Sequence, residues 1–423
     1  MRTSYFGRYS GATFEIRSSI ADLVALDNAS AVNGSAVYVL SESETYILDT
    51  SNAFTAFGNL IIARTVGFGR WFRRSKAYVV GNHTLWYAVR SSIGGNSLFG
   101  FTPGQLLASS SIQPDIIVRL SMGASANAHR IACDNQGNVW VSSFRGAAVP
   151  WQVFKFRLTD ILDGTGTVTP SITLTNALSA GLPQAIDHVN SIAFDKLNNL
   201  WVAGRNTALA RGIVQQIPQT ILSRDGSYAV VPPVSLQCAA GVWHDLEKSI
   251  CFDGNSNLWL TSYYSPTPQT SKVLLSQRVV TDLALVPSVY WSGSNFAGPE
   301  GIAFGPTGLL WIANFDDNSI KAFNPQEPTG NPAPIVTIAS ASIVDPIYIS
   351  FDVSGNMWVL NYSNWQLLKF NASDILASGS PAPNVVLSYA GLVPLNGIDQ
   401  GAGDFCFPHN PNVGGLLPSG QDI

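Results

Sequence analysis

The stretch Ser191-Ile-Ala-Phe-Asp-Lys-Leu-Asn-Asn-Leu-Trp201-Val decides the fold of this chain. It reads as an apolar strand, a turn rich in Asp, Asn and Gly, and a second strand that carries a tryptophan. Four further copies of this pattern have their tryptophans at Trp140, Trp259, Trp311 and Trp358, and two weaker copies precede them around Tyr38 and Trp86. A fixed period of about fifty residues predicts a repeat architecture.

The aromatic positions run evenly from residue 38 to residue 358, with gaps of 48, 54, 61, 58, 52 and 47 residues. This regularity favours one large closed unit over the two or three ordinary domains that a chain of 423 residues could hold. Hydrophobic content of 46% is ample for a core, and charged content of 12% is about half of the usual ~25%. A disordered chain is excluded, because it would be poor in apolar residues.

Each repeat holds four short apolar stretches bounded by Gly, Pro, Asn and Ser, a pattern typical of β-strands. A single sheet of this kind has two apolar faces and cannot bury both alone, whereas sheets packed radially in a ring bury them all. The sequence therefore predicts an all-β, seven-bladed β-propeller of four-stranded antiparallel blades. Six blades are the alternative, because the first two copies are degenerate. The recurring tryptophans are expected to fill the space between neighbouring blades.

The predicted blades start near residues 20, 76, 129, 190, 248, 300 and 346, so the propeller is expected to span residues 20–390. Residues 1–19 are an N-terminal extension, in which Ala12–Arg17 alternates like a strand and would close the ring by joining a terminal blade. Residues 391–423 are predicted to form an irregular, Gly/Pro-rich C-terminal tail that wraps or docks. Short helices are expected only in connections, at residues 158–162 and 373–376.

The four cysteines, Cys133, Cys238, Cys251 and Cys406, show no CxxC spacing. We expect buried free thiols, with neither a disulfide framework nor a zinc site. The N-terminal residues contain no apolar stretch of the kind found in secretory signals. No apolar run reaches the ~18 residues of a membrane span. A cytoplasmic or virion location without a membrane partner is therefore expected.

The segment Gly298-Pro-Glu-Gly-Ile-Ala-Phe, followed by a Gly and then Leu-Trp311-Ile-Ala-Asn, resembles the NHL-type propeller repeat. It is also similar to the superfamily of virginiamycin B lyase and the gluconolactonase-like hydrolases, over roughly residues 120–370. The resemblance implies a propeller, but it implies a function less firmly, because such propellers include lyases, lactonases and pure binding proteins. Enzymes of this superfamily place a metal or a general acid at the channel mouth. The lyase-like members carry a His and a Glu in their late blades, where this sequence has Glu300 and no histidine, His409 lying in the tail.

The loop that leads into each innermost strand should lie at one rim of the central channel, which we call the channel mouth. Two residues before the strand's Ile, the repeats carry His129, Asn190, Lys248, Glu300 and Ile347. Slightly upstream lie Asp187, His188, His244 and Asp245. Convergent polar groups at a channel mouth predict a ligand site, and imidazole with carboxylate would suit zinc. Ordinary solvated rim residues explain the same pattern, so neither a catalytic residue nor a metal or other cofactor is predicted.

The turns at residues 134–138 and 253–257 are rich in oxygen ligands but lack the distal Glu of a calcium loop. Turn chemistry explains them, because Asp caps its own turn and Gly or Asn accepts a positive φ.

From Thr50 to Pro114 the chain contains no acidic residue. A candidate docking patch within this stretch mixes basic and aromatic side chains, namely Arg64, Arg70, Trp71, Phe72, Arg73 and Arg74. Such a patch suits an acidic protein partner or a nucleic acid. The overall net charge of −4 disfavours a dedicated nucleic-acid binder.

The interpretation that we favour is a rigid, non-enzymatic interaction or scaffold module. It would contact other proteins of a larger assembly, such as a phage virion or tail, through its rims and terminal arms. The alternative is an NHL-like lyase or hydrolase with a metal-assisted site at the channel mouth, built on His129, His188, His244 and Glu300.

Overall fold

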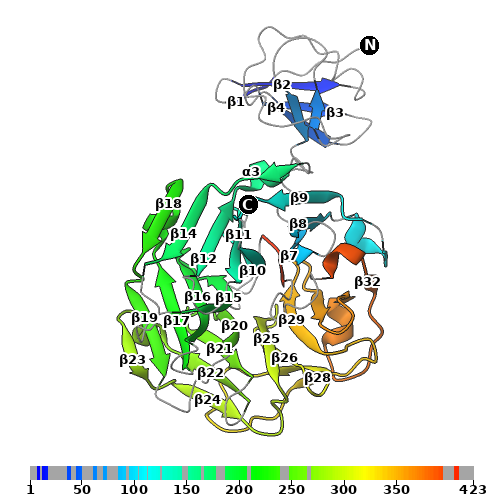
Figure 1. Ribbon diagram of the computed structural model, residues 1–423. Helices are drawn as coiled ribbons and strands as arrows, with labels where there is room; N and C mark the ends of the chain where they lie inside the picture. Colours follow the sequence, from blue (N-terminus) through cyan, green and yellow to red (C-terminus); the bar gives the residue numbers. More distant parts are fainter. Residues whose placement is uncertain are drawn as a thin grey trace.

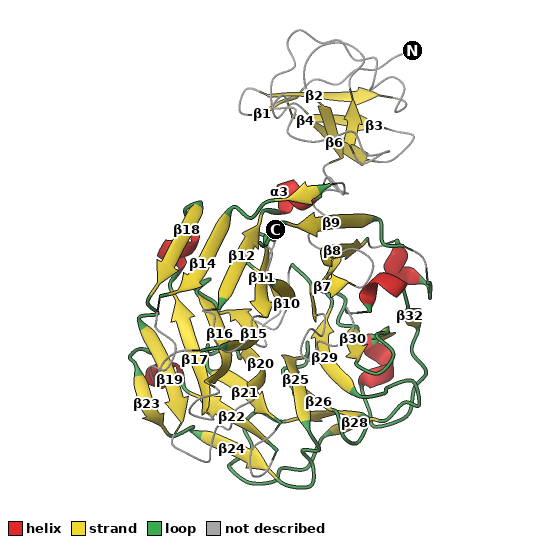
Figure 2. Ribbon diagram, viewed as in Figure 1, coloured by secondary structure: helices red, strands yellow, loops and turns green. Residues whose placement is uncertain are grey.

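The computed structural model of the chain contains a ring of six β-sheets around a central channel, which is a six-bladed β-propeller (Figure 1). The structure describes residues 84–408 except 92–94, 103, 112, 124–125, 145–150, 163–165, 178–185, 207–210, 239–246, 264–267 and 394–403. Before residue 84 it describes the backbone of six strands alone. All-β architecture is confirmed, and the ring has the smaller of the two predicted numbers of blades (Figure 2).

We number the blades in chain order and give their strands from the channel outward. Blade 1 contains β33 (Asp404–Cys406), β7 (Leu85–Ser91), β8 (Gly95–Phe101), β9 (Ile116–Leu120) and β13 (Thr167–Val168). Blade 2 contains β10 (Asn127–Cys133), β11 (Val139–Phe144), β12 (Gln152–Phe156), β14 (Ile172–Asn176) and β18 (Gly226–Val230). Blade 3 contains β15 (His188–Phe194), β16 (Leu200–Asn206), β17 (Arg211–Ile217), β19 (Val234–Cys238) and β23 (Asp282–Leu285).

The remaining three blades have four strands each. Blade 4 contains β20 (Glu247–Phe252), β21 (Leu258–Ser262), β22 (Gln269–Val273) and β24 (Val289–Ser292). Blade 5 contains β25 (Pro299–Phe304), β26 (Leu310–Asn314), β27 (Ser319–Phe323) and β28 (Val336–Ile338). Blade 6 contains β29 (Pro346–Phe351), β30 (Met357–Asn361), β31 (Leu367–Phe370) and β32 (Val385–Leu387).

Helices are short and lie in the connections. Within the described residues they are η1 (Gln105–Leu107), α3 (Leu158–Ile161), α4 (Gln219–Leu222), η2 (Leu275–Arg278), η3 (Ala372–Ile375) and η4 (Ala390–Leu392). The two predicted helical connections therefore coincide with α3 and η3. No helix in this part of the chain is long and apolar enough to cross a membrane.

The first predicted blade does not belong to the ring. Its strands lie in a separate six-stranded sheet whose order is β1 (Gly7–Tyr9), β2 (Ala12–Arg17), β3 (Ala36–Val39), β4 (Glu44–Asp49), β6 (Arg70–Arg73) and β5 (Ile61–Ala63). Strand β2, which was expected to close the ring, pairs with β1 and β3 instead. The expected boundary at residue 20 is thus wrong. The copy around Tyr38 lacks both the Asp turn and the tryptophan that hold the true blades together.

The ring is closed by β33, a strand from the tail that was expected to be irregular. It pairs antiparallel with β7, so that Cys406 lies opposite Trp86. The same register places Ala193 opposite Trp201 and Cys251 opposite Trp259 in other blades. The C-terminal segment is therefore the missing first strand of the first repeat, and it lies between the innermost strands of blades 6 and 2.

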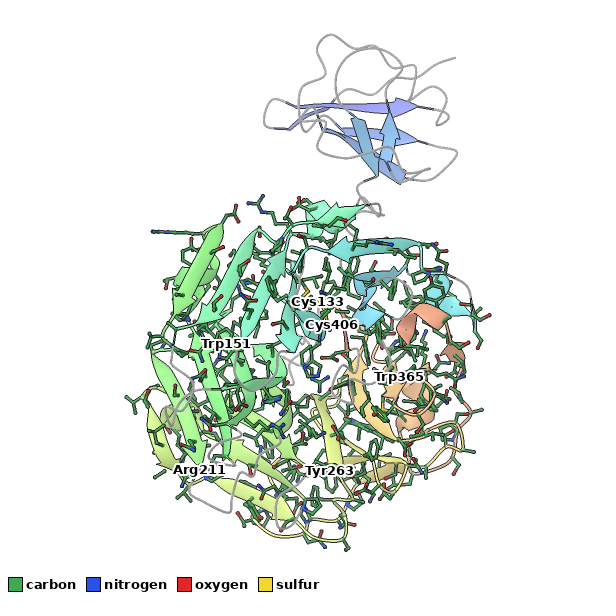
Figure 3. All side chains as sticks on the ribbon, in the orientation of Figure 1. Cys133, Trp151, Arg211, Tyr263, Trp365 and Cys406 are labelled. Carbon is green, nitrogen blue, oxygen red and sulfur yellow. A yellow bond between two sulfur atoms is a disulfide. The ribbon has the colours of Figure 1, made fainter. Side chains whose placement is uncertain are left out.

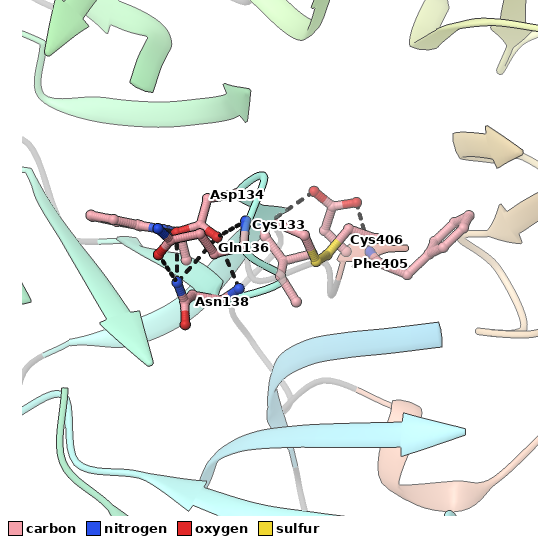
Figure 4. The surroundings of a disulfide bond; sticks show 9 residues. Cys133, Asp134, Gln136, Asn138, Phe405 and Cys406 are labelled. Atoms are coloured by element: carbon pink, nitrogen blue, oxygen red, sulfur yellow. Dashed lines mark hydrogen bonds between the residues drawn. A yellow bond between two sulfur atoms is a disulfide. The ribbon is translucent and has the colours of Figure 1, made fainter. Parts of the chain in front are cut away.

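A disulfide bond joins Cys133 at the end of β10 to Cys406 of β33, across a sequence separation of 273 residues (Figures 3 and 4). The expectation that all four thiols are free is thus wrong for this pair. Spacing in the sequence could not reveal the pair, because it depends on where β33 lies in the ring. Cys238 and Cys251 are buried free thiols, as expected.

A second closure runs around the outside of the ring. In each blade, the outermost strand pairs in parallel with a segment that reaches back from the following blade. Strands β13, β18 and β23 make this contact for blades 1 to 3, and single bridges make it for blades 4 to 6. The last of these bridges joins Ser110 of the blade 1 connection to Leu387 of blade 6. The first and last blades are therefore tied at both the inner and the outer radius.

Each pair of neighbouring blades encloses an apolar layer, and in five of the six pairs the tryptophan of one blade lies against a phenylalanine of the next. These contacts are Trp140–Phe194, Trp201–Phe252, Trp259–Phe304, Trp311–Phe351 and Trp358–Phe407, with ring centroids 5.7 to 6.2 Å apart. An indole that buries ~150–250 Å² contributes about 4–6 kcal/mol as an upper estimate. The predicted role of the tryptophans as filler between blades is confirmed.

Four of the turns position the tryptophan through an aspartate. In blade 4, Asp253 Oδ1 accepts hydrogen bonds from the backbone N–H groups of Asn255 and Asn257, while Oδ2 accepts from Asn257 Nδ2 and Trp259 Nε1. Asp134, Asp195 and Asp352 make the corresponding bonds to Trp140, Trp201 and Trp358. Protein donors thus engage all four carboxylates. This arrangement supports turn chemistry over a calcium loop.

Blade 5 shows what happens without the aspartate. Gly305 occupies the position, and Trp311 Nε1 has no hydrogen-bond partner. A Cβ atom at Gly305 would meet Trp311 Nε1 at 2.5 Å, so the indole has moved into the space that the side chain vacates. The Asp–indole bond, worth about 1–3 kcal/mol, therefore orients the ring, while apolar burial holds it.

Replacing Asp253 by Ala should lower the free energy of unfolding by about 2–4 kcal/mol, because it leaves Trp259 Nε1 and two backbone N–H groups unsatisfied. Thr307→Ala, in the exposed turn of blade 5, is the control and should change it by less than about 0.5 kcal/mol. Urea unfolding followed by tryptophan fluorescence measures both. Equal effects of the two changes would contradict the role assigned to the aspartate.

The disulfide should stabilise the closed ring by about 2–4 kcal/mol. Cys406→Ala removes it, and Cys251→Ala at the same strand register in blade 4 removes only a buried thiol, at a cost of about 1 kcal/mol. We expect the urea midpoint to fall much further for Cys406→Ala, and dithiothreitol to lower the midpoint of the unmodified chain and of Cys251→Ala but not that of Cys406→Ala. Four reactive thiols in the denatured, unreduced protein would show that the bond does not form.

Candidate functional site

One β-bulge recurs at the channel mouth. In blades 2 to 6 the pairing of the innermost strand shifts register at the residue two positions before the conserved Ile. The bulged residues are His129, Asn190, Lys248, Glu300 and Ile347, the set that the sequence spacing singles out. A bulge re-aims its side chain and is frequent beside binding sites. The five residues therefore share one structural position around the channel.

The structure brings Lys248 and Glu300 together. Lys248 Nζ lies 2.9 Å from Glu300 Oε1, so that an ion pair links blades 4 and 5. Lys248 is half-buried, its ammonium lies 5.3 Å from the centre of the Tyr263 ring, and Glu300 is buried. The backbone carbonyl of Glu300 accepts a hydrogen bond from Thr261 Oγ1. Both side chains are thus engaged by neighbours in the ring.

The two described histidines lie near one another but do not form a metal site. His129 is buried, and its Nδ1 lies 2.8 Å from the carbonyl oxygen of Val189 in blade 3. Burial, with a further contribution from the nearby Arg130 charge, holds the pKa of His129 well below its usual value. The imidazole is therefore neutral at pH 7, and Nδ1–H donates the bond. His188 Nδ1 lies 2.7 Å from the carboxylate of its neighbour Asp187.

Arg130, which the sequence spacing did not select, occupies the channel just below the mouth. Its Nε donates to the carbonyl of Asn190, and its guanidinium carbon lies 4.7 Å from the centre of the Tyr348 ring in blade 6. Ser191, Ser249 and Gly301 occupy the position equivalent to Arg130 in blades 3 to 5. A large basic residue where three other repeats have small ones could therefore have pointed to Arg130 from the sequence. Arg130 therefore connects three blades across the channel.

Asp404 of the closing strand faces the same space. Its carboxylate accepts hydrogen bonds from the backbone N–H groups of Ile131, at 3.3 Å, and Phe405, at 2.7 Å. Burial raises the pKa of Asp404 to about 6, against the opposing effect of Arg130. Burial also raises the pKa of Tyr348. Arg130, Tyr348 and Asp404 thus form a charge-balanced layer that divides the channel.

Among the described residues no three His, Cys, Asp or Glu side chains lie close enough to hold a metal ion. His244, Asp245 and His409 lie outside the described residues. Of the candidate docking patch, Arg70, Trp71, Phe72 and Arg73 form β6, whereas Arg64 and Arg74 lie outside the described residues. The four residues of β6 belong to the N-terminal sheet and not to a blade.

No family model and no curated protein matches the sequence. Solved structures do match the fold. A Bacteroides caccae protein of unknown function is similar at 10% identity and a TM-score of 0.45, over 72% of this chain and 98% of that one. A catalytically inactive virginiamycin B lyase from Staphylococcus aureus with quinupristin is similar at 13% identity and a TM-score of 0.40, over 75% and 87%.

A putative gluconolactonase is similar at 14% identity and a TM-score of 0.37, over 64% of this chain and 83% of the other. The propeller is thus similar in fold to lyase and gluconolactonase-like structures, which is the resemblance carried by residues 298–314. At these identities the likeness concerns the fold alone.

The carboxyl of Asp404 leads us to predict how the stability of the fold depends on pH. Its pKa rises from 3.8 to about 6 on folding, so the folded state favours the protonated form. The free energy of unfolding that this group contributes is fully present below about pH 4 and is lost as the pH rises through about 6. A shift of about two units corresponds to roughly 3 kcal/mol.

We expect the stability of the unmodified chain, relative to Asp404→Asn, to fall by roughly that amount between pH 4 and pH 7. Urea unfolding at several pH values measures the difference, in which the titration of His129 cancels because both proteins contain it. A difference that stays constant across this range would mean that Asp404 is ionised throughout.

Proposed function

We propose that the protein is a non-enzymatic β-propeller module that binds another protein surface through the outside of its ring. The observation that carries this proposal is a group of exposed apolar side chains on the outer edge of blades 3 and 4. Soluble proteins seldom leave such groups uncovered unless they mark an interaction site. The ring supplies a rigid support for the surface.

We call this group the outer patch, and it consists of Val231, Leu274, Leu275, Val279, Val280 and Val286. The exposed fractions of Val279, Val280 and Val286 are 63, 62 and 72%, and that of Val231 is 63%. The outer patch comes from two segments, residues 231–235 and 274–286. Thr281 joins them, because its Oγ1 donates to the carbonyl of Pro233 and accepts from the backbone N–H of Ser235. Hydrogen bonds between this side chain and the main chain therefore hold the two segments in place.

The chemistry at the channel mouth supports a binding role over a catalytic one. Lys248 and Glu300 neutralise one another, and His129 donates to the backbone of the next blade. Of the groups that the lyase or hydrolase alternative requires, His129, His188 and Glu300 are therefore already engaged. That alternative rests on the family resemblance.

We further propose that the partner is another component of an assembly, with the non-repeat segments as additional contacts. A virion or tail setting is a hypothesis that rests on composition: low charge, a polar Ser/Asn/Gly-rich surface and a Gly/Pro-rich end.

The outer patch should make the pure protein self-associate at high concentration. Val279→Ser combined with Val280→Ser should weaken that association about 10- to 30-fold, because each valine loses ~1 kcal/mol of apolar burial. Sedimentation velocity between about 1 and 100 µM measures it. Leu376→Ser, an exposed leucine on blade 6 outside the patch, is the matched control and should leave the association unchanged.

A chain that stays monomeric at every concentration would contradict the outer patch as an association surface. A stoichiometric bound metal, with a melting temperature that falls when EDTA is added, would favour the lyase or hydrolase alternative.

A further inference from the structure

A cavity of about 640 Å³ lies in the channel on the side of the Asp–Asn turns, opposite the channel mouth. The layer of Arg130, Tyr348 and Asp404 lies between the mouth and this cavity. Residues of five innermost strands and of the closing strand line it, and the Cys133–Cys406 disulfide forms part of its wall (Figure 4). Its volume lies within the ~300–1,000 Å³ that is typical of small-molecule sites.

The wall of the cavity is apolar because one register position repeats. Each of blades 2 to 6 contributes an isoleucine at that position, and blade 1 contributes Phe405. The isoleucines are Ile131, Ile192, Ile250, Ile302 and Ile349. Small residues at the next position, such as Ala132, Ala193 and Ser350, keep the interior open. A ligand here would contact hydrocarbon around the middle of the cavity.

The inner end of the cavity is polar but nearly neutral. The Asp404 carboxylate lies beside the Arg130 charge, which offsets it. Tyr348 lines this end as well, and burial raises the pKa of its hydroxyl, so the hydroxyl is uncharged. The inner end therefore suits one uncharged polar group.

The outer end of the cavity disfavours anions. Asp134, Asp195 and Asp352 line it, with Lys196 as the basic residue of the lining. A carboxylate or phosphate would face these acids, and an ammonium group at the inner end would face Arg130. Anions are thus disfavoured at the outer end, and cations at the inner end.

We propose that this cavity binds an uncharged amphiphile, with an apolar chain or ring system against the isoleucine wall. Its single hydroxyl or amide group would bond Asp404 at the inner end. The site is separate from the channel mouth and from the outer patch.

Two probes with the same ring system test the charge preference. N-phenylnaphthylamine is neutral, and anilinonaphthalene sulfonate carries a sulfonate. We expect the neutral probe to fluoresce on binding with micromolar affinity and the sulfonate to bind at least about 10-fold more weakly, equivalent to ~1.4 kcal/mol. Decanol should displace the neutral probe, whereas decanoate should not.

Two variants locate the site. Ser249→Phe fills the cavity, and Val353→Trp caps it from an exposed position at its outer end, so this second change should not impair folding. Each should weaken binding of the neutral probe at least 10-fold. Ser227→Phe, on the exposed face of β18, is the control and should leave binding unchanged.

Asp404→Ala should weaken displacement by decanol about 3- to 10-fold while the probe still binds. Val279→Ser combined with Val280→Ser, in the outer patch, should have no effect, which separates this inference from the proposed function. The inference is overturned if the folded protein does not bind the neutral probe. Equal binding of the sulfonate, or unchanged binding in both Ser249→Phe and Val353→Trp, would overturn it as well.

Discussion

The pairing of β33 with β7 is the contact on which the rest of the ring depends. A radial arrangement buries both faces of every blade only when the last blade meets the first. Strand β33 supplies three residues to that junction, and its pairing spans more than 300 positions of the chain. Main-chain bonds this few cannot hold two blades, so the disulfide to Cys133 and the outer bridge between Ser110 and Leu387 complete the closure.

The junction also differs in chemistry from the others. At five interfaces a tryptophan meets a phenylalanine of the next blade's innermost strand. In blade 2 the residue at that position is Cys133 instead of phenylalanine. The disulfide therefore stands where the aromatic contact would be, between blades 1 and 2. A covalent bond thus takes the place of the aromatic contact at this interface, within an apolar layer that Trp86 and its neighbours still form.

The sequence predicted the fold wherever a short local pattern is enough to determine the structure. The Asp turn and the tryptophan lie within twelve residues of each other, so each blade could be recognised by itself. Ring closure could not be predicted, because Phe405-Cys-Phe407 is too short to be identified as a strand without its partner strand β7. Spacing predicted that His129, Asn190, Lys248 and Glu300 share a rim, since a bulge recurs at one register. It could not predict the Lys248–Glu300 pair, which depends on the separation of two blades.

Closure also explains why the channel has two unlike ends. Asp404 enters the channel only because β33 completes blade 1, and its buried charge needs a counterion. Arg130 supplies one from blade 2, since small residues at the same position in blades 3 to 5 leave room for its side chain. The resulting layer keeps the polar mouth apart from the isoleucine-lined cavity. The strand that closes the ring therefore also contributes one of the two charges at this level of the channel.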